Sequence, residues 1–214
     1  MRIIYRISPF KPDNPALFYS DDKWKLVEMC HNSFLKAGGN NYPTTYIIDS
    51  CDWGKIFKGW GEIVEINTHN KNASLLTAYD VASKLNDKIL FVEDDYLWRP
   101  DTISLLDTAL DVLPVLSPYD HPGHYTEDRF DHRYEIKLIG NQTYRTCPSN
   151  THTFSIQSEV FKQNMEMMKK YGVKDHEMFT ELNKVAQLWC PIPSFATHLA
   201  VGCLSPNVNW NELT

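Results

Sequence analysis

The sequence lacks the charge pattern of a nucleic-acid-binding protein. Its 214 residues carry 21 Lys and Arg against 27 Asp and Glu, which gives a formal net charge of -6, and no basic stripe is visible. Nucleic-acid binders gain affinity by neutralising phosphates with clustered cations, so we expect no nucleic-acid partner. An anionic nucleotide ligand would need help from a bound cation or from backbone N–H groups.

Signals for export, membrane insertion and disulfide bonding are also missing. The N-terminus enters a short strand-like run and has neither the long apolar region nor the small-residue cleavage site of a signal peptide. We see no transmembrane segment, and we expect a cytoplasmic protein. The five Cys are scattered and include no Cys-x-x-Cys pair, so free thiols fit better than a disulfide framework or a zinc knuckle.

Several phosphate-handling motifs are absent as well. The chain has no Gly-x-x-x-x-Gly-Lys-Ser/Thr sequence, which excludes a P-loop NTPase. The first strand-like run, Ile3 to Ile7, lacks the acidic residues that receiver domains and aspartyl phosphatases place at its end. What remains is a chain with 43% hydrophobic residues, enough for one sizeable core.

The first half alternates strand-like runs with stretches of helical periodicity. This alternation is typical of βαβ units and a mostly parallel sheet. The predicted strands cover residues 2–7, 44–49, 62–66 and 88–93, and the helices between them carry Leu26, Cys30 and Phe34, then Leu75, Tyr79, Ala82 and Leu85. We expect one α/β domain over residues 1–214, with a central, mostly parallel sheet flanked by helices.

The second half is less regular. Asp101 is predicted to be the N-cap of a helix that carries Ile103, Leu106, Leu110 and Leu113 on one face. Further strands are predicted over residues 115–116, 134–139 and 151–156, and a helix over 159–171. A last helix is predicted from Met178, Leu182, Val185 and Trp189, which recur at helical spacing.

An acidic cluster follows the most apolar of these strands. The run Ile89-Leu90-Phe91-Val92 has the character of a central buried strand, and Glu93, Asp94 and Asp95 follow it directly. Ligands of open parallel sheets bind outside the carboxyl ends of the strands, and oxygen ligands there suit Mg²⁺ or Mn²⁺. Three adjacent carboxylates would repel one another without a cation. The alternative is that one acid caps or turns the chain and the others are solvated.

From about Tyr46 to Leu113 the order of these signals resembles the donor-binding half of GT-A glycosyltransferases, notably the inverting family 2 and its relatives. The strand and acidic loop that hold the nucleobase in that group resemble Ile47-Ile48-Asp49-Ser50-Cys51-Asp52. The segment before the next helix resembles Asn70-Lys71-Asn72-Ala73, and the Asp-x-Asp (DXD) strand with its Pro-Asp helix start resembles residues 88–101. Here Glu-Asp-Asp stands where Asp-x-Asp is usual.

The resemblance implies roles for individual residues. Asp95 would be the principal ligand of Mn²⁺ or Mg²⁺, Asp94 or Glu93 would contact the ribose or the sugar, and Asp49 would contact the base. Because the first strand of this fold commonly passes into a donor-binding loop, the further candidates for nucleotide contact are Arg6, Ser8 and Pro9, together with Asn72 of the later segment. The alternative for Arg6 is a surface ion pair.

The same resemblance gives the second half a catalytic base and another metal ligand. The base of an inverting enzyme of this fold lies in an acidic segment at the start of a late helix, where this chain has Asp175 and Glu177. The resemblance favours Glu177, because the acid of the similar motif is its last residue. Both acids could instead cap the helix and complement its dipole. His198 lies in a late segment resembling the loop that supplies a His ligand in some GT-A enzymes, although a hydrogen-bonded structural role is the alternative.

A loop over residues 117–125 is rich in aromatic residues and histidine. His121 and His124 could chelate a metal, but no further ligands accompany them at a recognised spacing. Tyr119 and Tyr125 could stack on an acceptor sugar, although an ordinary aromatic loop would look the same.

The sequence therefore predicts a metal-dependent, inverting glycosyltransferase. Its nucleotide-sugar donor, with a UDP-sugar favoured, would bind residues 1–113, and a carbohydrate or another hydroxyl acceptor would bind residues 114–214. A nucleotidyltransferase acting on sugar phosphates is the nearest alternative, although Ser8-Pro9-Phe10-Lys11-Pro12 lacks the Gly-rich loop of that class. A non-catalytic module that binds nucleotides or sugars is the other.

Overall fold

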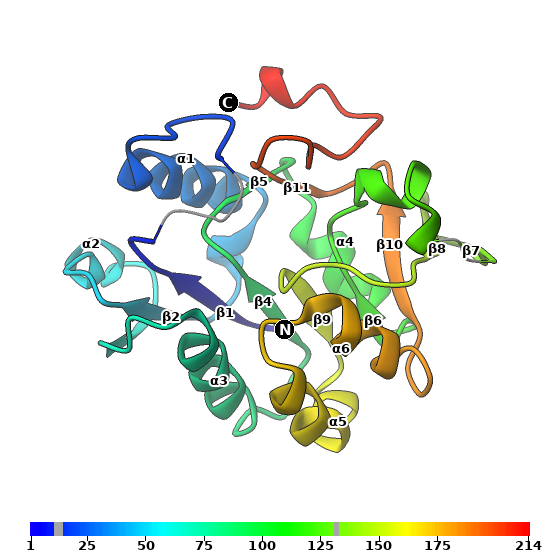
Figure 1. Cartoon of the computed structure of the whole chain (residues 1–214), viewed down its shortest axis with the longest axis horizontal. Helices are drawn as coiled ribbons and strands as arrows, with labels where there is room; N and C mark the ends of the chain where they lie inside the picture. The colour runs from blue at the N-terminus through cyan, green and yellow to red at the C-terminus, as the bar shows by residue number, and fades with distance from the viewer. Residues whose placement is uncertain (11–14, 131–132) are drawn as a thin grey trace.

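The structure is a computed structural model that describes residues 1–10, 15–130 and 133–214. Its main feature is a nine-stranded sheet in the order β3-β2-β1-β4-β9-β6-β10-β8-β7 (Figure 1). These strands are β1 (Arg2–Ile7), β2 (Thr44–Asp49), β3 (Glu62–Ile66), β4 (Ile89–Val92), β6 (Val115–Leu116), β7 (Ile136–Ile139), β8 (Gln142–Thr146), β9 (Phe154–Ile156) and β10 (Leu188–Ile192). A second sheet pairs β5 (Tyr96–Trp98) with β11 (Ala196–His198).

The large sheet is parallel in its first half and mixed in its second. Strands β3, β2, β1 and β4 run parallel to one another, whereas β9 is antiparallel to both of its neighbours, β4 and β6. Strand β10 lies between β6, to which it is parallel, and β8, to which it is antiparallel. The predicted α/β fold with a mostly parallel central sheet is confirmed, and its first four strands lie where the sequence pattern places them.

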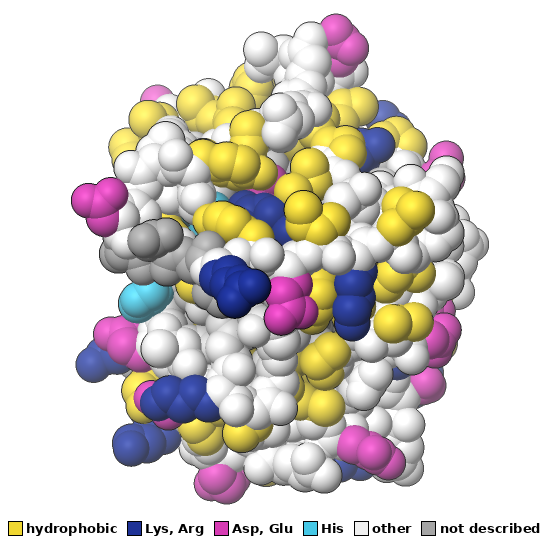
Figure 2. All heavy atoms as spheres, turned by 90° about the vertical axis from the view of Figure 1, so that its right-hand side faces the viewer, with side chains coloured by type: hydrophobic (Ala, Val, Ile, Leu, Met, Phe, Trp, Pro, Cys, Tyr) yellow, Lys and Arg dark blue, Asp and Glu magenta, His cyan; other side chains and the backbone are white. Residues whose placement is uncertain are grey.

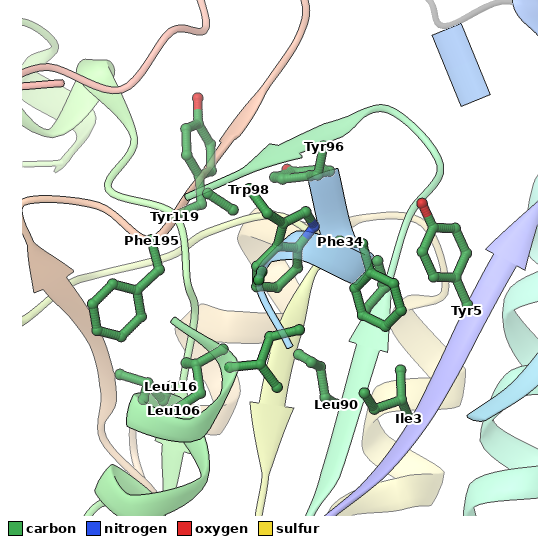
Figure 3. Packing of buried hydrophobic residues seen from close by; sticks show 14 of the residues in the cluster. Ile3, Tyr5, Phe34, Leu90, Tyr96, Trp98, Leu106, Leu116, Tyr119 and Phe195 are labelled. Atoms are coloured by element: carbon green, nitrogen blue, oxygen red, sulfur yellow. The ribbon is translucent and has the colours of Figure 1, made fainter. Parts of the chain in front are cut away.

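Helices cover both faces of this sheet (Figure 1). They are α1 (Lys23–Lys36), α2 (Gly54–Phe57), α3 (Lys71–Ala82), α4 (Ile103–Ala109), α5 (Ser158–Tyr171) and α6 (Asp175–Leu182). Side chains of a strand alternate between the two faces, so β1 sends Tyr5 into one core and Ile4 into the other. The first core contains Phe34 of α1 and Trp98 of β5 (Figure 3), and the second contains Phe161 of α5.

The last residues of the chain pack beside α1. Leu199 and Trp210 share a small apolar cluster with Leu26 and Cys30 of α1 and Leu97 of β5. The indole Nε1 of Trp210 donates to the Ser205 carbonyl at 2.8 Å. The segment after β11 therefore holds the two-stranded sheet against α1.

Two of the sequence predictions are wrong. Asp101 is not the N-cap of α4: its φ of 58° puts it in a left-handed turn, and Thr102 occupies the cap position. The last predicted helix ends at Leu182, Val185 is exposed, and Trp189 belongs to β10. Asn183 caps the end of this helix, and its Oδ1 accepts the Leu188 N–H at 2.6 Å. Trp189 then pairs with Thr146 of β8 as part of the sheet.

Two other expectations can be compared with the described residues. All five Cys are free thiols in the structure, as the sequence predicts. In the described part of the chain, no helix combines the length and the apolar character needed to cross a membrane.

Candidate functional site

A cavity of about 260 Å³ opens at the carboxyl ends of β1, β2 and β4. This is the edge at which open parallel sheets bind ligands. The strand ends meet the N-terminal turns of three helices there, together with side chains from later loops and β11. The residues that line the cavity are Arg6, Ile7, Ser8, Phe10, Lys23, Asp49, Lys71, Ser74, Glu93, Asp94, Asp95, Thr151, His152, Val173, Asp175 and His198.

The first acid after β4 is paired with an arginine of β1. Arg6 Nη2 lies 2.6 Å from Glu93 Oε1, and both side chains are mostly buried. Because β1 and β4 are neighbours, strand pairing alone brings these two side chains together. Burial raises the pKa of Glu93, and the Arg6 guanidinium opposes that rise.

The second acid is paired with a lysine at the start of α1. Lys23 Nζ lies 2.7 Å from Asp94 Oδ1, and the Ser8 N–H donates to Asp94 Oδ2 at 2.8 Å. Burial lowers the pKa of Lys23, but the attraction of Asp94 and then Asp95 outweighs it, so the ammonium pKa is raised. Glu93 and Asp94 thus already face protein cations. The sequence predicts that three adjacent carboxylates need a bound cation, but these two are neutralised by Arg6 and Lys23.

The third acid differs from the other two. Asp95 Oδ2 lies 3.2 Å from His198 Nε2, while Oδ1 is buried and has no hydrogen-bond partner among the described residues. Burial alone would raise the pKa of Asp95. The charge of His198 and its hydrogen bond to the carboxylate outweigh this effect, so the pKa of Asp95 is lowered. A buried carboxylate oxygen without a partner is costly, and that cost indicates a missing ligand.

His198 reaches Asp95 because β11 pairs with β5. The register places His198 opposite Tyr96, the residue after Asp95, and the two rings stack at 5.2 Å with an interplanar angle of 7°. Burial lowers the pKa of His198, but the Asp95 carboxylate raises it to about 10. One carboxylate and one imidazole form a donor set that Mn²⁺ or Mg²⁺ accepts, so these residues fit a divalent cation.

Asp49 lies at the end of β2, in the wall of the same cavity. Its carboxylate accepts the Thr68 N–H at 2.8 Å, the Thr68 hydroxyl at 2.6 Å and the Ser50 hydroxyl at 2.7 Å. Burial raises the pKa of Asp49, but these hydrogen bonds, led by that of the Thr68 hydroxyl, lower it below the ordinary value. The carboxylate therefore stays ionised and also ties the end of β2 to the segment after β3.

The cavity brings most of the predicted site residues together. Eight of them line it: Arg6, Ser8, Asp49, Glu93, Asp94, Asp95, Asp175 and His198. Pro9, Asn72 and Glu177 are not among the lining residues. Asp175 is the first residue of α6, and Glu177 lies two residues further along on an exposed position.

Several lining residues escaped the sequence reasoning. Lys23 lies at the start of α1, Lys71 lies at the start of α3, and Phe10 follows β1. His152 is buried, neither of its ring nitrogens has a hydrogen-bond partner among the described residues, and burial lowers its pKa to about 3. Only one general rule could have pointed to these residues from the sequence. The N-termini of helices that follow parallel strands face this edge of the sheet, and anion-binding side chains are favoured there.

The aromatic loop is built differently from the sequence expectation. Tyr119 is fully buried and its hydroxyl donates to the Cys203 carbonyl, so it cannot stack on a sugar. His124 instead joins Asp120 and Cys190 in a buried group whose ligand atoms lie within 4.8 Å of one another. Arg145 Nη2 lies 2.5 Å from Asp120 Oδ1 and 3.1 Å from His124 Nδ1. The guanidinium already serves these atoms as their cation, which argues against a metal site here.

Comparisons with known proteins support the fold. No protein-family model matches the sequence, and no curated protein matches it. Among solved structures, GalNAc-T7 with UDP, GalNAc and Mn²⁺ has a TM-score of 0.61 at 12% identity, over 95% of this chain and 44% of that one. The galactosyltransferase LgtC, solved with donor and acceptor sugar analogues, has a TM-score of 0.51 at 12% identity, over 87% and 71%.

A synthetase solved with CTP is similar to about the same degree as LgtC. The synthetase for CMP:2-keto-3-deoxy-manno-octonic acid, complexed with CTP, has a TM-score of 0.52 at 12% identity, over 88% of this chain and 87% of that one. Identities this low show the fold alone. The resemblance to GT-A glycosyltransferases is confirmed at that level, and the fold is shared with nucleotidyltransferases that use CTP.

Proposed function

We propose that this chain is a metal-dependent glycosyltransferase that moves a sugar from a nucleotide-diphosphate sugar to an acceptor hydroxyl with inversion. The observation that carries the proposal is Asp95. Asp95 Oδ2 lies 3.2 Å from His198 Nε2, and the buried Oδ1 has no hydrogen-bond partner among the described residues. In the same cavity the two neighbouring acids already have protein cations. A donor set left incomplete at the ligand-binding edge of a GT-A fold is what a metal-bound nucleotide would complete.

Asp95 and His198 would hold the cation, Mn²⁺ or Mg²⁺. When bound, it would stabilise the negative charge that develops on the departing nucleoside diphosphate. Three cationic side chains line the same cavity: Lys71, and the Arg6 and Lys23 side chains that pair with Glu93 and Asp94. These side chains would orient the diphosphate, and Asp49, whose hydrogen bonds keep it ionised, would accept an N–H of the base.

Asp175 is the proposed general base. It lines the cavity from the start of α6, whereas Glu177 is not among the lining residues. The carboxylate would take the proton of the acceptor hydroxyl as its oxygen attacks the anomeric carbon. As the new bond forms, the bond from that carbon to the diphosphate oxygen breaks with its electron pair leaving on the nucleotide, and the anomeric configuration inverts.

One observation favours the nucleotidyltransferase alternative. Lys23 supplies a buried cation at the start of α1, in the region between β1 and α1 where that class binds nucleoside triphosphates. Such an enzyme would release pyrophosphate from a triphosphate and a sugar phosphate. A glycosyltransferase would release a nucleoside diphosphate from a nucleotide sugar, so the products separate the two functions.

The first test is thermal unfolding with nucleoside diphosphates, triphosphates and nucleotide sugars, each with Mn²⁺ or with a chelator. A ligand at a hundredfold excess over its Kd stabilises the folded state by about 2.7 kcal/mol, so a good donor will stand out. The shift should disappear in Asp95→Asn and persist in Asp111→Asn, whose exposed carboxylate pairs with Lys88 away from the cavity.

Three outcomes distinguish the candidates. A metal-dependent shift with a nucleotide sugar, followed by release of nucleoside diphosphate once acceptors are added, supports the glycosyltransferase. A shift with a triphosphate and release of pyrophosphate supports the alternative. A shift without turnover in either assay points to a binding module, and no shift with any nucleotide removes the donor site.

A further inference from the structure

Strand β7 forms the outer edge of the large sheet. Among the described residues, β7 pairs only with β8, and it is the last strand of the sheet (Figure 1). Edge strands expose backbone N–H and C=O groups that can pair with another chain, and proteins usually protect them. This edge lies in the second half of the chain, away from the cavity at β1, β2 and β4.

The side chains on one face of this edge are apolar and exposed. Ile136 and Leu138 flank Lys137 in the sequence. The Ile136 and Leu138 side chains are both 70% exposed. Tyr125 and Tyr134, exposed by 52% and 41%, extend the same face, because both rings lie against the guanidinium of Arg145, the partner of Ile136 in β8. We call Tyr125, Tyr134, Ile136 and Leu138 the edge patch.

Figure 2 views the molecule from the side of β7 and β8. Hydrophobic side chains are spread over this face, with individual charged residues between them. Lys137 does not interrupt the edge patch, because its ammonium lies 4.8 Å from the centre of the Trp189 ring on the opposite face of the strand. A lysine on an edge strand usually disfavours pairing with another chain, but the Lys137 side chain points away from the edge patch.

The backbone of β7 shows which residues face outward. The Thr146 N–H donates to the Glu135 carbonyl at 3.0 Å, so Glu135 faces β8. In an antiparallel pair, residues alternate between facing the partner strand and facing away from it. Ile136 and Leu138 therefore direct their N–H and C=O groups outward, and these two apolar residues also form the exposed edge.

We propose that the partner of this edge is a second copy of the chain, paired antiparallel through β7 about a twofold axis at Ile136. In that register Ile136 faces Ile136 of the second copy, and Tyr134 faces Leu138. Glu135 faces Lys137 of the second copy on the other face, and the twofold axis repeats this pair. The pairing joins two nine-stranded sheets into one and makes the two edge patches continuous.

Charge selects this register over the nearest alternative. If the axis lay at Lys137, Ile136 would face Leu138 and the two Lys137 side chains would lie directly opposite each other, which is destabilising. The axis at Ile136 satisfies the outward hydrogen bonds and pairs opposite charges at once. A contact of this size buries less than about 1,000 Å², so the dimer is expected to be weak and dependent on concentration.

The test is sedimentation equilibrium of the full chain from about 5 to about 500 µM, a range that brackets weak association. The wild type is expected to dimerise within it. Ile136→Lys and Leu138→Lys should each raise the dimer dissociation constant about tenfold or more. Val185→Lys is the matched control, because Val185 is also 70% exposed and lies outside the edge patch; it should leave the dissociation constant unchanged.

Charge exchange tests the register itself. Glu135→Lys and Lys137→Glu alone should each weaken the dimer by placing like charges opposite each other, and the double variant should restore it. A chain that stays monomeric throughout the range overturns the proposal, as does a dimer that Ile136→Lys does not weaken. A double variant no tighter than the single ones overturns the twofold axis at Ile136. Circular dichroism of every variant confirms that the fold is retained.

Discussion

Replacing Lys23 by Met should destabilise the protein far more than an ordinary surface lysine substitution. The Lys23 and Asp94 side chains are only 8% and 10% exposed, and their charged atoms lie 2.7 Å apart. Removing one partner of a buried pair costs about 3–5 kcal/mol, because the other charge is left uncompensated. The Ser8 N–H still bonds Asp94, and the pair borders a cavity, so we expect the lower end of that range.

The assay is reversible unfolding by heat and by urea. A loss of about 3 kcal/mol corresponds to a fall in Tm of about 6–12 °C for a chain of this length. Lys25→Met is the matched control: Lys25 also lies in the first turn of α1, but it is 58% exposed and 3.6 Å from Asp22. That variant should stay within about 0.5 kcal/mol of the wild type.

A double-mutant cycle isolates the reason for the loss. Adding Asp94→Asn to Lys23→Met removes the uncompensated charge, so the double variant should be more stable than the sum of the two single losses predicts. If Lys23→Met proves as mild as Lys25→Met, or if the two losses simply add, the reasoning about a buried ion pair is refuted.

The remaining predictions concern the acids of the cavity. Asp175→Asn should lower turnover about 100-fold or more while leaving donor binding intact, and Glu177→Gln should change neither, as steady-state kinetics and calorimetry would show. Equal losses in both variants would contradict the assignment of the base. Because the folded-state pKa of Asp49 is depressed, its contribution to stability is present above the unfolded pKa and disappears as the pH falls through the lower folded pKa. Asp49→Asn should therefore flatten the acid limb of the stability-against-pH curve measured by urea unfolding, and an unchanged limb would refute this.

The parts of the fold that were predictable are those whose pattern is local. Strands β1 to β4 are short runs rich in β-branched and aromatic residues and bounded by polar segments, so their bounds follow from the local pattern. Trp189 misled the prediction because its helical spacing from Met178 is real, yet pairing of β10 with β6 and β8 overrides it. Pairing over long sequence distances has no local signal, which is also why β5, β8 and β11 were missed.

The candidate site divides in the same way. Asp95 was predictable because it follows a buried strand, and His198 was found only through a resemblance, since 103 positions separate them in the chain. Lys23 and His152 carry no motif, and only folding shows that they face the cavity. Tyr119 was misjudged because an aromatic residue in a polar loop looks exposed until its packing is known.

The position of β10 affects how the molecule is made on the ribosome. This strand is synthesised after both β6 and β8, yet it lies between them in the sheet. Until it arrives, β8 and β7 have no strand to connect them to the rest of the sheet, and His198, which follows β10, is not yet beside Asp95. Domains tend to fold from the N-terminus as they emerge, so the parallel half can form first. A nascent chain that ends before residue 188 would therefore be a partly folded intermediate in need of protection from aggregation, and the cavity acquires His198 only after β10 and β11 have been synthesised.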